Sequence, residues 1–279
     1  MKKRLFLILI ILILVLIVFA SFIIKKDKTE TKEGKIMDIN EFDSNDFQID
    51  LTLDNDGKEI HYSAYIPKNV ENINNLSMYI TLPGWEGLYF QGVGANLKYE
   101  DFAYVAKKMN HNMIILAPQL NDWGITSAKD TIYLTKYYKE KYNVKKIYIN
   151  GYSGGGETLS LVLQERPDLY DRALLVSSQW DGHTNKLIQS KTPVYLFTGE
   201  NDSYYGSSSF KDIYDKIYNE YKKIGLIEKE INELIILDIR NHEYFVEHNV
   251  SDEHAGGGLA AHEESIMKWL LELEWWEKL

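Results

Sequence analysis

A serine flanked by glycines is the residue in this chain best suited to covalent chemistry. It is Ser153, in the segment Gly-Tyr-Ser-Gly-Gly-Gly-Glu at 151–157. An apolar run at 146–150 precedes it, and apolar side chains recur with helical spacing over 158–165. Strand, Gly-x-Ser-x-Gly and helix in this order are typical of a nucleophile elbow, a sharp turn that exposes the serine hydroxyl. The pattern predicts that Ser153 is a nucleophile. The alternative is a glycine-rich turn with an incidental serine.

The elements that must position this serine are read from the apolar pattern. Alternation at 47–53 and 60–66, around the turn Asn-Asp-Gly at 55–57, predicts an antiparallel hairpin at a sheet edge. From residue 76 onward, predicted strands and helices alternate. That alternation predicts an α/β fold, a mostly parallel eight-stranded sheet with helices on both faces. The later strands are predicted at 76–82, 113–117, 146–150, 173–178, 194–198 and 234–239, and the helices at 99–110, 127–142, 158–165, 210–221 and after residue 262.

The order of reactive residue types makes the sequence similar to the α/β-hydrolase family. After Ser153 come an aspartate and then a histidine, each on a loop that follows a predicted strand. The resemblance covers residue 47 to the end. Within the superfamily it looks most like bacterial exported esterases and the catalytic domains of prolyl-oligopeptidase-like peptidases. It implies the α/β-hydrolase fold and a Ser-His-Asp triad that works without a cofactor or metal.

The family acid is expected on the loop that follows the strand at 194–198. That loop reads Gly-Glu-Asn-Asp-Ser-Tyr-Tyr-Gly over 199–206, so the resemblance assigns the acid to Asp202. An Asx turn or a helix cap is the structural alternative for this aspartate. Asp181, which also leaves a strand at the active end, and Glu200 are the rival acids.

The base is expected between the last strand and the last helix. His254 begins the segment His-Ala-Gly-Gly-Gly, a loop able to hold an imidazole above the sheet, and we assign the base to it. His242, which directly follows the last strand, is the rival. A metal site made of His242, His248 and His254 is a further alternative. Their six-residue spacing matches no metal motif known to us, and we expect no metal site.

An oxyanion hole needs backbone N–H donors aimed at the tetrahedral oxygen. The resemblance implies one from Gly154, the residue after the nucleophile. The second comes from the loop Pro-Gly-Trp-Glu-Gly at 83–87, with Trp85 N–H as the expected donor and Glu86 as the alternative. This loop departs from the His-Gly-Gly-Gly loop of many lipases and esterases, which leaves the second donor and any lipase-type assignment open.

Aromatic residues gather on the loops at the active end. We expect Trp85, Trp123, Trp180 and Tyr204 to bind substrate, as a wall for a sugar ring or an aromatic acyl group. The alternative is that they cover the edges of the core. The segment 203–233 is either a partial lid or a surface helix pair.

The first residues predict a membrane anchor. Twenty uncharged residues run from Leu5 to Ile24, which at the helical rise spans about 30 Å, the thickness of a bilayer core. A cleaved signal peptide would have a shorter apolar region, so we expect a signal-anchor helix at 1–24, a charged tether at 25–45 and a catalytic domain at 46–279. We expect the catalytic domain on the extracytoplasmic side of the cell membrane; secretion after cleavage is the alternative.

Composition limits the partners. The net charge is −10, and residues 1–28 carry six basic groups and one acidic group, so the rest is near −15. This argues against nucleic acid as a partner. The chain has no cysteine, which excludes a disulfide framework and a thiolate metal site.

The sequence therefore predicts a serine hydrolase acting on carboxylic esters, with a small-molecule or glycan ester as substrate. A prolyl-oligopeptidase-like peptidase and a non-catalytic carbohydrate-binding module on the same fold are the alternatives. The oligomeric state and the identity of the ester do not follow from the sequence.

Overall fold

The computed structural model describes residues 46–85 and 88–273, all of which belong to one compact unit of the chain, residues 36–279. The predicted anchor at 1–24, the tether at 25–45 and Glu86 lie outside the described residues. No helix in the described part has the length and hydropathy that crossing a bilayer requires.

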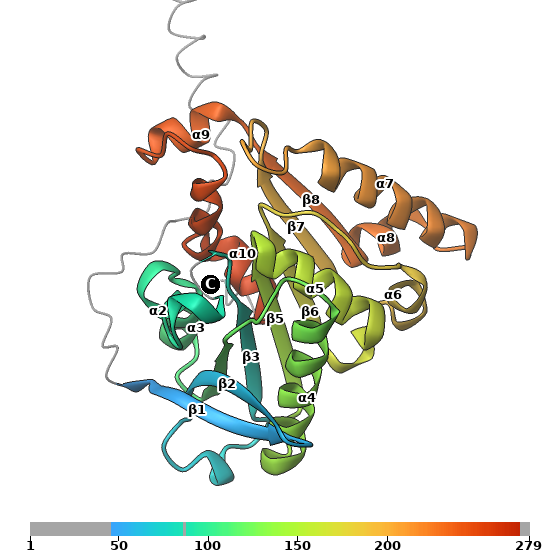
Figure 1. Cartoon of the computed structure of the whole chain (residues 1–279). Coiled ribbons are helices and arrows are strands. Elements are labelled where there is room, and N and C mark those ends of the chain that lie inside the picture. Colours follow the sequence, from blue (N-terminus) through green and yellow to red (C-terminus); the bar gives the residue numbers. More distant parts are fainter. Residues whose placement is uncertain (1–45, 86–87, 274–279) are drawn as a thin grey trace, which may run out of the picture. The chain divides into compact units, whose positions relative to one another are not determined.

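Eight strands form one sheet in the order β1-β2-β4-β3-β5-β6-β7-β8 (Figure 1). The hairpin is antiparallel, with Leu53 opposite Ile60, and β2 also runs antiparallel to β4; all later pairs are parallel. The predicted eight-stranded, mostly parallel sheet with an antiparallel start is therefore confirmed. The strands are β1 Gln48–Asn55, β2 Lys58–Tyr65, β3 Ser77–Leu82, β4 Met113–Pro118, β5 Lys146–Tyr152, β6 Arg172–Val176, β7 Val194–Gly199 and β8 Ile235–Arg240.

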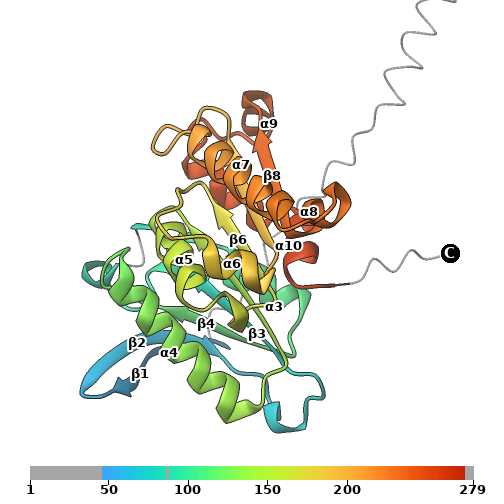
Figure 2. The ribbon, with the colours of Figure 1, turned by 90° about the vertical axis from the view of Figure 1, so that its right-hand side faces the viewer.

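Helices cover both faces of this sheet, as predicted. Buried apolar side chains of α4, α5, α6, α7 and α8 form one core cluster with the sheet, and those of α2, α3, the 3-10 helix η6 and α10 form the other. Figure 2 looks onto the first of these faces. The helices are α2 Asn96–Tyr99, α3 Phe102–Met109, α4 Ile125–Tyr142, α5 Gly154–Glu165, α6 Asn185–Ser190, α7 Ser208–Lys223, α8 Glu228–Leu234, α9 His242–Glu247, η6 Ala255–Ala261 and α10 Glu264–Leu270, with short 3-10 turns η2 Val70–Asn72, η4 Tyr89–Gln91 and η5 Pro167–Leu169.

One helix begins later than predicted, and the segment 203–233 forms a pair of helices, one of its two predicted alternatives. The helix expected at 99–110 is α3, which begins at Phe102, and a separate short helix, α2, precedes it; Glu100 between them has extended backbone with φ −125° and ψ 129°. The segment 203–233 folds as α7 and α8, and α7 buries Phe210, Ile217 and Tyr221 in the core cluster. An apolar face packed this way makes α7 part of the body of the fold rather than a lid.

Candidate active site

The turn between β5 and α5 has the backbone of a nucleophile elbow. Ser153 lies between the two elements with φ 52° and ψ −125°, a conformation that L-residues rarely adopt. A Cβ on Gly151 would lie 2.4 Å from the carbonyl oxygen of Gly155, and a Cβ on Gly155 would lie 2.3 Å from the carbonyl oxygen of Leu82. Both flanking glycines are therefore required by backbone packing, and the strained serine is held between them.

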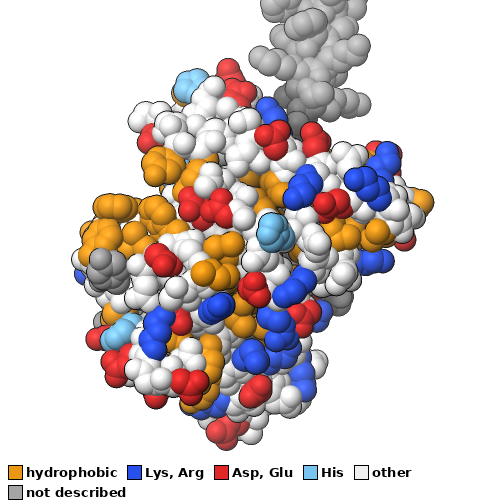
Figure 3. Space-filling model, turned by 45° about the vertical axis from the view of Figure 1, so that its right-hand side comes forward, with side chains coloured by type: hydrophobic (Ala, Val, Ile, Leu, Met, Phe, Trp, Pro, Cys, Tyr) orange, Lys and Arg blue, Asp and Glu red, His pale blue; other side chains and the backbone are white. Residues whose placement is uncertain are grey.

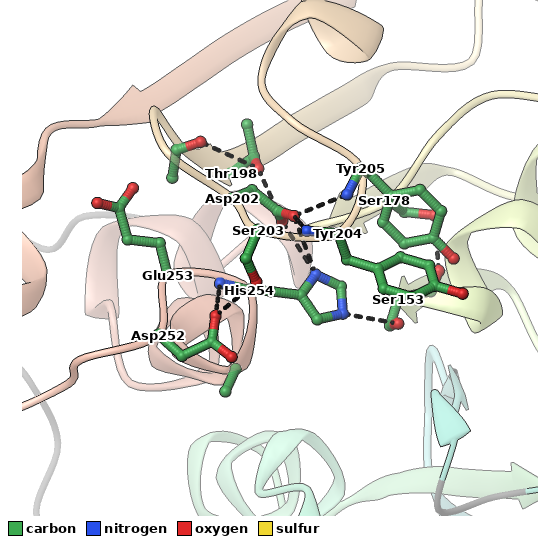
Figure 4. Close-up of polar contacts among 12 residues, drawn as sticks. Ser153, Ser178, Thr198, Asp202, Ser203, Tyr204, Tyr205, Asp252, Glu253 and His254 are labelled. Carbon is green, nitrogen blue, oxygen red and sulfur yellow. Dashed lines mark hydrogen bonds and ion pairs between the residues drawn. The ribbon is translucent and has the colours of Figure 1, made fainter.

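The structure brings Ser153, His254 and Asp202 into one hydrogen-bonded chain (Figure 4). Ser153 Oγ lies 3.0 Å from His254 Nε2, and His254 Nδ1 lies 3.0 Å from Asp202 Oδ2 and 3.2 Å from Oδ1. The Asp202 side chain is fully buried and that of His254 is 18% exposed. A hydroxyl, an imidazole and a buried carboxylate in this order can activate the hydroxyl as a nucleophile.

Asp202 is held as a carboxylate by donors from its own loop. Its Oδ1 accepts the backbone N–H groups of Tyr204 and Tyr205, both at 2.9 Å, and the Thr198 hydroxyl lies 3.4 Å from Oδ2. Burial alone would raise the pKa of Asp202, but the hydrogen bonds from His254 and from these N–H groups outweigh it and lower the pKa below its ordinary value. Asp202 therefore carries its negative charge at neutral pH.

The loop that carries His254 is fixed on both sides of the imidazole. The backbone N–H of His254 donates to Asp252 Oδ1 at 3.0 Å, and the Tyr152 phenol donates to the His254 carbonyl at 3.0 Å. The rings of Tyr152, Tyr204 and Tyr205 surround the imidazole, with centroids 6.1, 5.3 and 5.6 Å from its own. These contacts limit the ring to the orientation that faces Ser153.

The two expected oxyanion donors flank the serine. Gly154 is the first residue of α5, so its N–H has no acceptor within the helix. On the other side, Gly84 approaches so closely that a Cβ there would lie 3.1 Å from Ser153 Cβ. The Gly84 N–H donates to the buried carboxylate of Glu100 at 2.8 Å, which fixes the loop just before Trp85. The roles of Trp85 and Gly154 as donors remain predictions, and the alternative donor Glu86 lies outside the described residues.

Three aromatic residues lie together beside the elbow. The Trp123 indole covers Gly154, where an added Cβ would lie 2.1 Å from the ring. The Trp85 ring is 6.5 Å from that of Trp123 and 4.9 Å from that of Phe90. Trp85 and Phe90 are 55% and 51% exposed, so they offer an open apolar surface next to Ser153.

The other two predicted substrate residues occupy different settings. Tyr204 is 68% exposed above the imidazole, where a substrate can reach it. Trp180 is half-buried against the core, and its indole N–H donates to the carbonyl of Gly182 at 2.8 Å within its own loop. Tyr204 is therefore available for contact with a substrate, whereas the Trp180 indole N–H is already used.

A phenol and a carboxylate also meet beside the nucleophile. The Tyr205 hydroxyl donates to Glu157 Oε1 at 2.5 Å. Burial raises the pKa of Glu157, and Tyr205 partly opposes that shift, while burial together with the neighbouring carboxylate raises the pKa of Tyr205. The phenol therefore stays protonated and links the acid loop to α5.

The rival residues do not join the Ser153 chain. Asp181 accepts a hydrogen bond from Gln179 at 3.1 Å, and Glu200 Oε1 accepts the His242 backbone N–H at 2.8 Å. His242 Nδ1 lies 2.9 Å from Glu253 Oε1. His248 Nδ1 lies 2.6 Å from the Tyr244 carbonyl. Because His242, His248 and His254 each face a different partner, they do not converge on a common point.

Several residues of the site were not predicted from the sequence. Tyr152 and Glu157 lie inside the glycine-rich segment 151–157, and their closeness to Ser153 in the sequence could have indicated that they belong to the site. Glu100 and Phe90 lie far from the reactive residues along the chain, and Glu253 directly precedes His254, but the residue types of all three carry no comparable signal.

No protein-family model matches this sequence, and no curated protein matches it. Solved structures do match. A thermostable esterase has a TM-score of 0.60 at 21% identity, covering 82% of this chain and 63% of its own. The chain has the α/β-hydrolase fold. A second similar structure, Est1E from Butyrivibrio proteoclasticus, has a TM-score of 0.53 at 14% identity, covering 81% of this chain and 98% of its own. Oligopeptidase B from Leishmania major has a TM-score of 0.52 at 13% identity, and this chain spans 38% of its length.

Proposed function

We propose that this α/β-hydrolase-fold protein is a serine hydrolase that cleaves carboxylic esters through an acyl-enzyme. One observation carries the proposal. The Ser153 hydroxyl, on a strained elbow, is 3.0 Å from an imidazole nitrogen whose other nitrogen faces a buried carboxylate. The thermostable esterase among the similar structures shares the fold, which supports ester hydrolysis as the activity.

Acylation begins at Ser153, the nucleophile of the hydrogen-bonded chain. Ser153 Oγ attacks the ester carbonyl carbon while His254 Nε2 takes the hydroxyl proton. Asp202 stabilises the resulting imidazolium without itself taking the proton. The tetrahedral intermediate then collapses: the bond from carbon to the alcohol oxygen breaks, and that oxygen receives the proton from Nε2. The alcohol leaves and the acyl group stays on Ser153.

Deacylation repeats the same steps with water. His254 Nε2 takes a proton from water as the water oxygen attacks the acyl carbon, and it returns that proton to Ser153 Oγ when the ester bond to the enzyme breaks. In both halves the N–H groups of Gly154 and Trp85 face the developing oxyanion. A single such donor contributes about 10²–10³-fold to kcat in enzymes of this kind.

The surroundings of the serine favour an ester with an apolar or aromatic part. Trp85, Phe90 and Trp123 form an apolar surface at the elbow, and a flat ring can lie against such side chains. A structure of Est1E has ferulic acid bound, which is an aromatic acid; the likeness to that protein is one of fold. A sugar ring can lie on the same surface.

The location and the partners form part of the proposal. The apolar run from Leu5 to Ile24 supports a single-pass anchor, and we propose that the catalytic domain it carries lies outside the cytoplasm. The excess of acidic groups argues against nucleic acid as a partner. On the face shown in Figure 3, acidic and basic side chains are interspersed.

The test is turnover of a matched substrate panel by the full chain in detergent. The panel holds 4-nitrophenyl acetate, butyrate and octanoate, methyl ferulate, an acetylated xylose and dipeptidyl 4-nitroanilides. We expect ester turnover that disappears in Ser153→Ala, with methyl ferulate or a short acyl ester preferred. Ester turnover that survives in Ser153→Ala, or no turnover of any ester by folded protein, contradicts the proposal.

A peptidase with the same triad is the second candidate. It is supported by the fold shared with oligopeptidase B and by the acidic body, which suits basic peptides. Faster cleavage of the dipeptidyl anilides than of the esters in the same panel decides for it. Binding of a sugar ligand that is unchanged in Ser153→Ala, with no hydrolysis at all, decides instead for a non-catalytic carbohydrate-binding module.

A further inference from the structure

Three consecutive residues of the acid loop bind three consecutive residues of the base loop. Asn201 binds Glu253, Asp202 binds His254, and the Ser203 hydroxyl donates to Asp252 Oδ1 at 3.0 Å. Only the middle contact belongs to the triad described above. Figure 4 shows that Glu253 and Asp252 come from the same segment as His254. The triad contact is therefore flanked by a polar contact on each side.

Glu253 makes the strongest of these flanking contacts. Its Oε2 accepts the Asn201 backbone N–H at 2.7 Å and its Oε1 accepts Asn201 Nδ2 at 3.0 Å. The side chain of Glu253 is 3% exposed, although glutamate is seldom buried without partners. Burial would raise the pKa of Glu253, but the bonds from Asn201 and His242 outweigh it and lower the pKa. Glu253 is thus a buried carboxylate whose charge is satisfied by the acid loop.

The fold leaves room for this carboxylate beside the end of β7. A Cβ on Gly199 would lie 2.5 Å from Glu253 Oε2 and 2.6 Å from its Cβ. His242 closes the other side, with Nδ1 at 2.9 Å from Oε1, and the His242 backbone N–H is held by Glu200. Of the two rivals from the sequence, His242 thus contacts Glu253 and Glu200 holds His242, and neither joins the Ser153 chain.

We propose that Glu253 is a positioning residue that sets the separation of Asp202 and His254. The inference rests on the proposed hydrolase function. Asn201 and Asp202 are chain neighbours, as are Glu253 and His254, and neighbouring Cα atoms are held about 3.8 Å apart. Fixing Asn201 to Glu253 therefore fixes the distance between the carboxylate and the imidazole. A displacement of about 1 Å at such a site costs about 10²-fold in rate.

The variant Glu253→Gln tests this in the full chain. The amide keeps the shape, but its NH2 group at the Oε1 position meets the Asn201 Nδ2 donor instead of accepting from it, so the contact between the two loops is weakened. We expect kcat for 4-nitrophenyl butyrate to fall by about 30- to 100-fold, with KM within about twofold. Glu247→Gln is the matched control, because Glu247 is an exposed residue at the end of α9 that forms no hydrogen bond with Asn201, Asp202 or His254; its kcat should stay near that of the wild type.

A double-mutant cycle separates positioning from general stability. If Glu253 acts through the contact between Asp202 and His254, adding Glu253→Gln to Asp202→Asn lowers kcat by less than about threefold more, because coupled sites are not additive. A full further loss in that background overturns the proposal, as does a loss confined to KM. The variant Asn201→Ala removes only the hydrogen bond from Nδ2 and should lower kcat by about fivefold, the value of one hydrogen bond. It replaces Glu253→Gln in these tests if that variant does not fold.

A readout that does not need turnover keeps this proposal distinct from the proposed function. The proton between His254 Nδ1 and Asp202 should give a downfield proton NMR resonance that disappears in Asp202→Asn. We expect Glu253→Gln to weaken or shift that resonance and Glu247→Gln to leave it unchanged. An unchanged resonance in Glu253→Gln overturns the positioning role, whereas a wild-type protein that shows the resonance but hydrolyses no substrate overturns the proposed function alone.

Discussion

Replacing Asp202 by asparagine should stop His254 from acting as the base without disturbing the fold. The asparagine oxygen can occupy the Oδ1 position and still accept the two backbone N–H groups of Tyr204 and Tyr205. Its NH2 group then occupies the Oδ2 position, 3.0 Å from His254 Nδ1. An N–H donor there forces Nδ1 to be the acceptor, which places the imidazole proton on Nε2. Nε2 then cannot take the proton of Ser153.

The expected loss follows from that tautomer. We expect kcat for a short acyl ester to fall by about 10³–10⁴-fold, which corresponds to about 4–5.5 kcal/mol in the activation barrier. The assay is steady-state hydrolysis of 4-nitrophenyl butyrate, with circular dichroism to confirm folding. Asp181→Asn is the matched control, because this rival aspartate contacts neither His254 nor Ser153. Near-normal activity of Asp202→Asn, or an equal loss in Asp181→Asn, refutes the reasoning.

The remaining predictions concern the elbow, acid stability and metals. Gly155→Ala should destabilise the protein by about 3 kcal/mol in urea unfolding, because its Cβ would lie 2.3 Å from the Leu82 carbonyl oxygen; Gly258→Ala, with open space around it, is the control, and equal midpoints contradict the argument. The pKa of Asp202 is lowered from 3.8, so the contribution of its carboxylate to stability is complete above that pH and is lost as pH falls through the folded pKa. The difference in unfolding free energy between wild type and Asp202→Asn should therefore shrink below about pH 4. A difference that stays constant with pH contradicts this argument. Dialysis against EDTA should leave ester turnover unchanged, and a loss restored by a divalent metal would contradict a metal-free triad.

Most of the fold could be predicted from local sequence patterns and from the order of residues along the chain. The apolar alternation and the Asn-Asp-Gly turn located the hairpin, and the strand and helix around Ser153 located the elbow. These features depend on contacts between near neighbours in the chain, which a single sequence displays. The order of Ser153, Asp202 and His254 then selected three residues that the structure brings within hydrogen-bonding distance.

The contacts that could not be predicted join distant parts of the chain. The Glu100 carboxylate accepts the N–H of Gly84, 16 residues earlier in the chain. Glu253 belongs to the same class, because its partner Asn201 is 52 residues away. Nothing in a residue's type or spacing specifies such a partner.

Covalent labelling of the serine tests the central claim most directly. The full chain is treated with a fluorophosphonate, and the modified peptide is identified by mass spectrometry, with His254→Ala and Ser153→Ala treated in parallel. The account predicts one adduct per chain, on Ser153, formed far more slowly in His254→Ala and absent in Ser153→Ala. Folded protein that forms no adduct, or that forms it on another residue, contradicts the account.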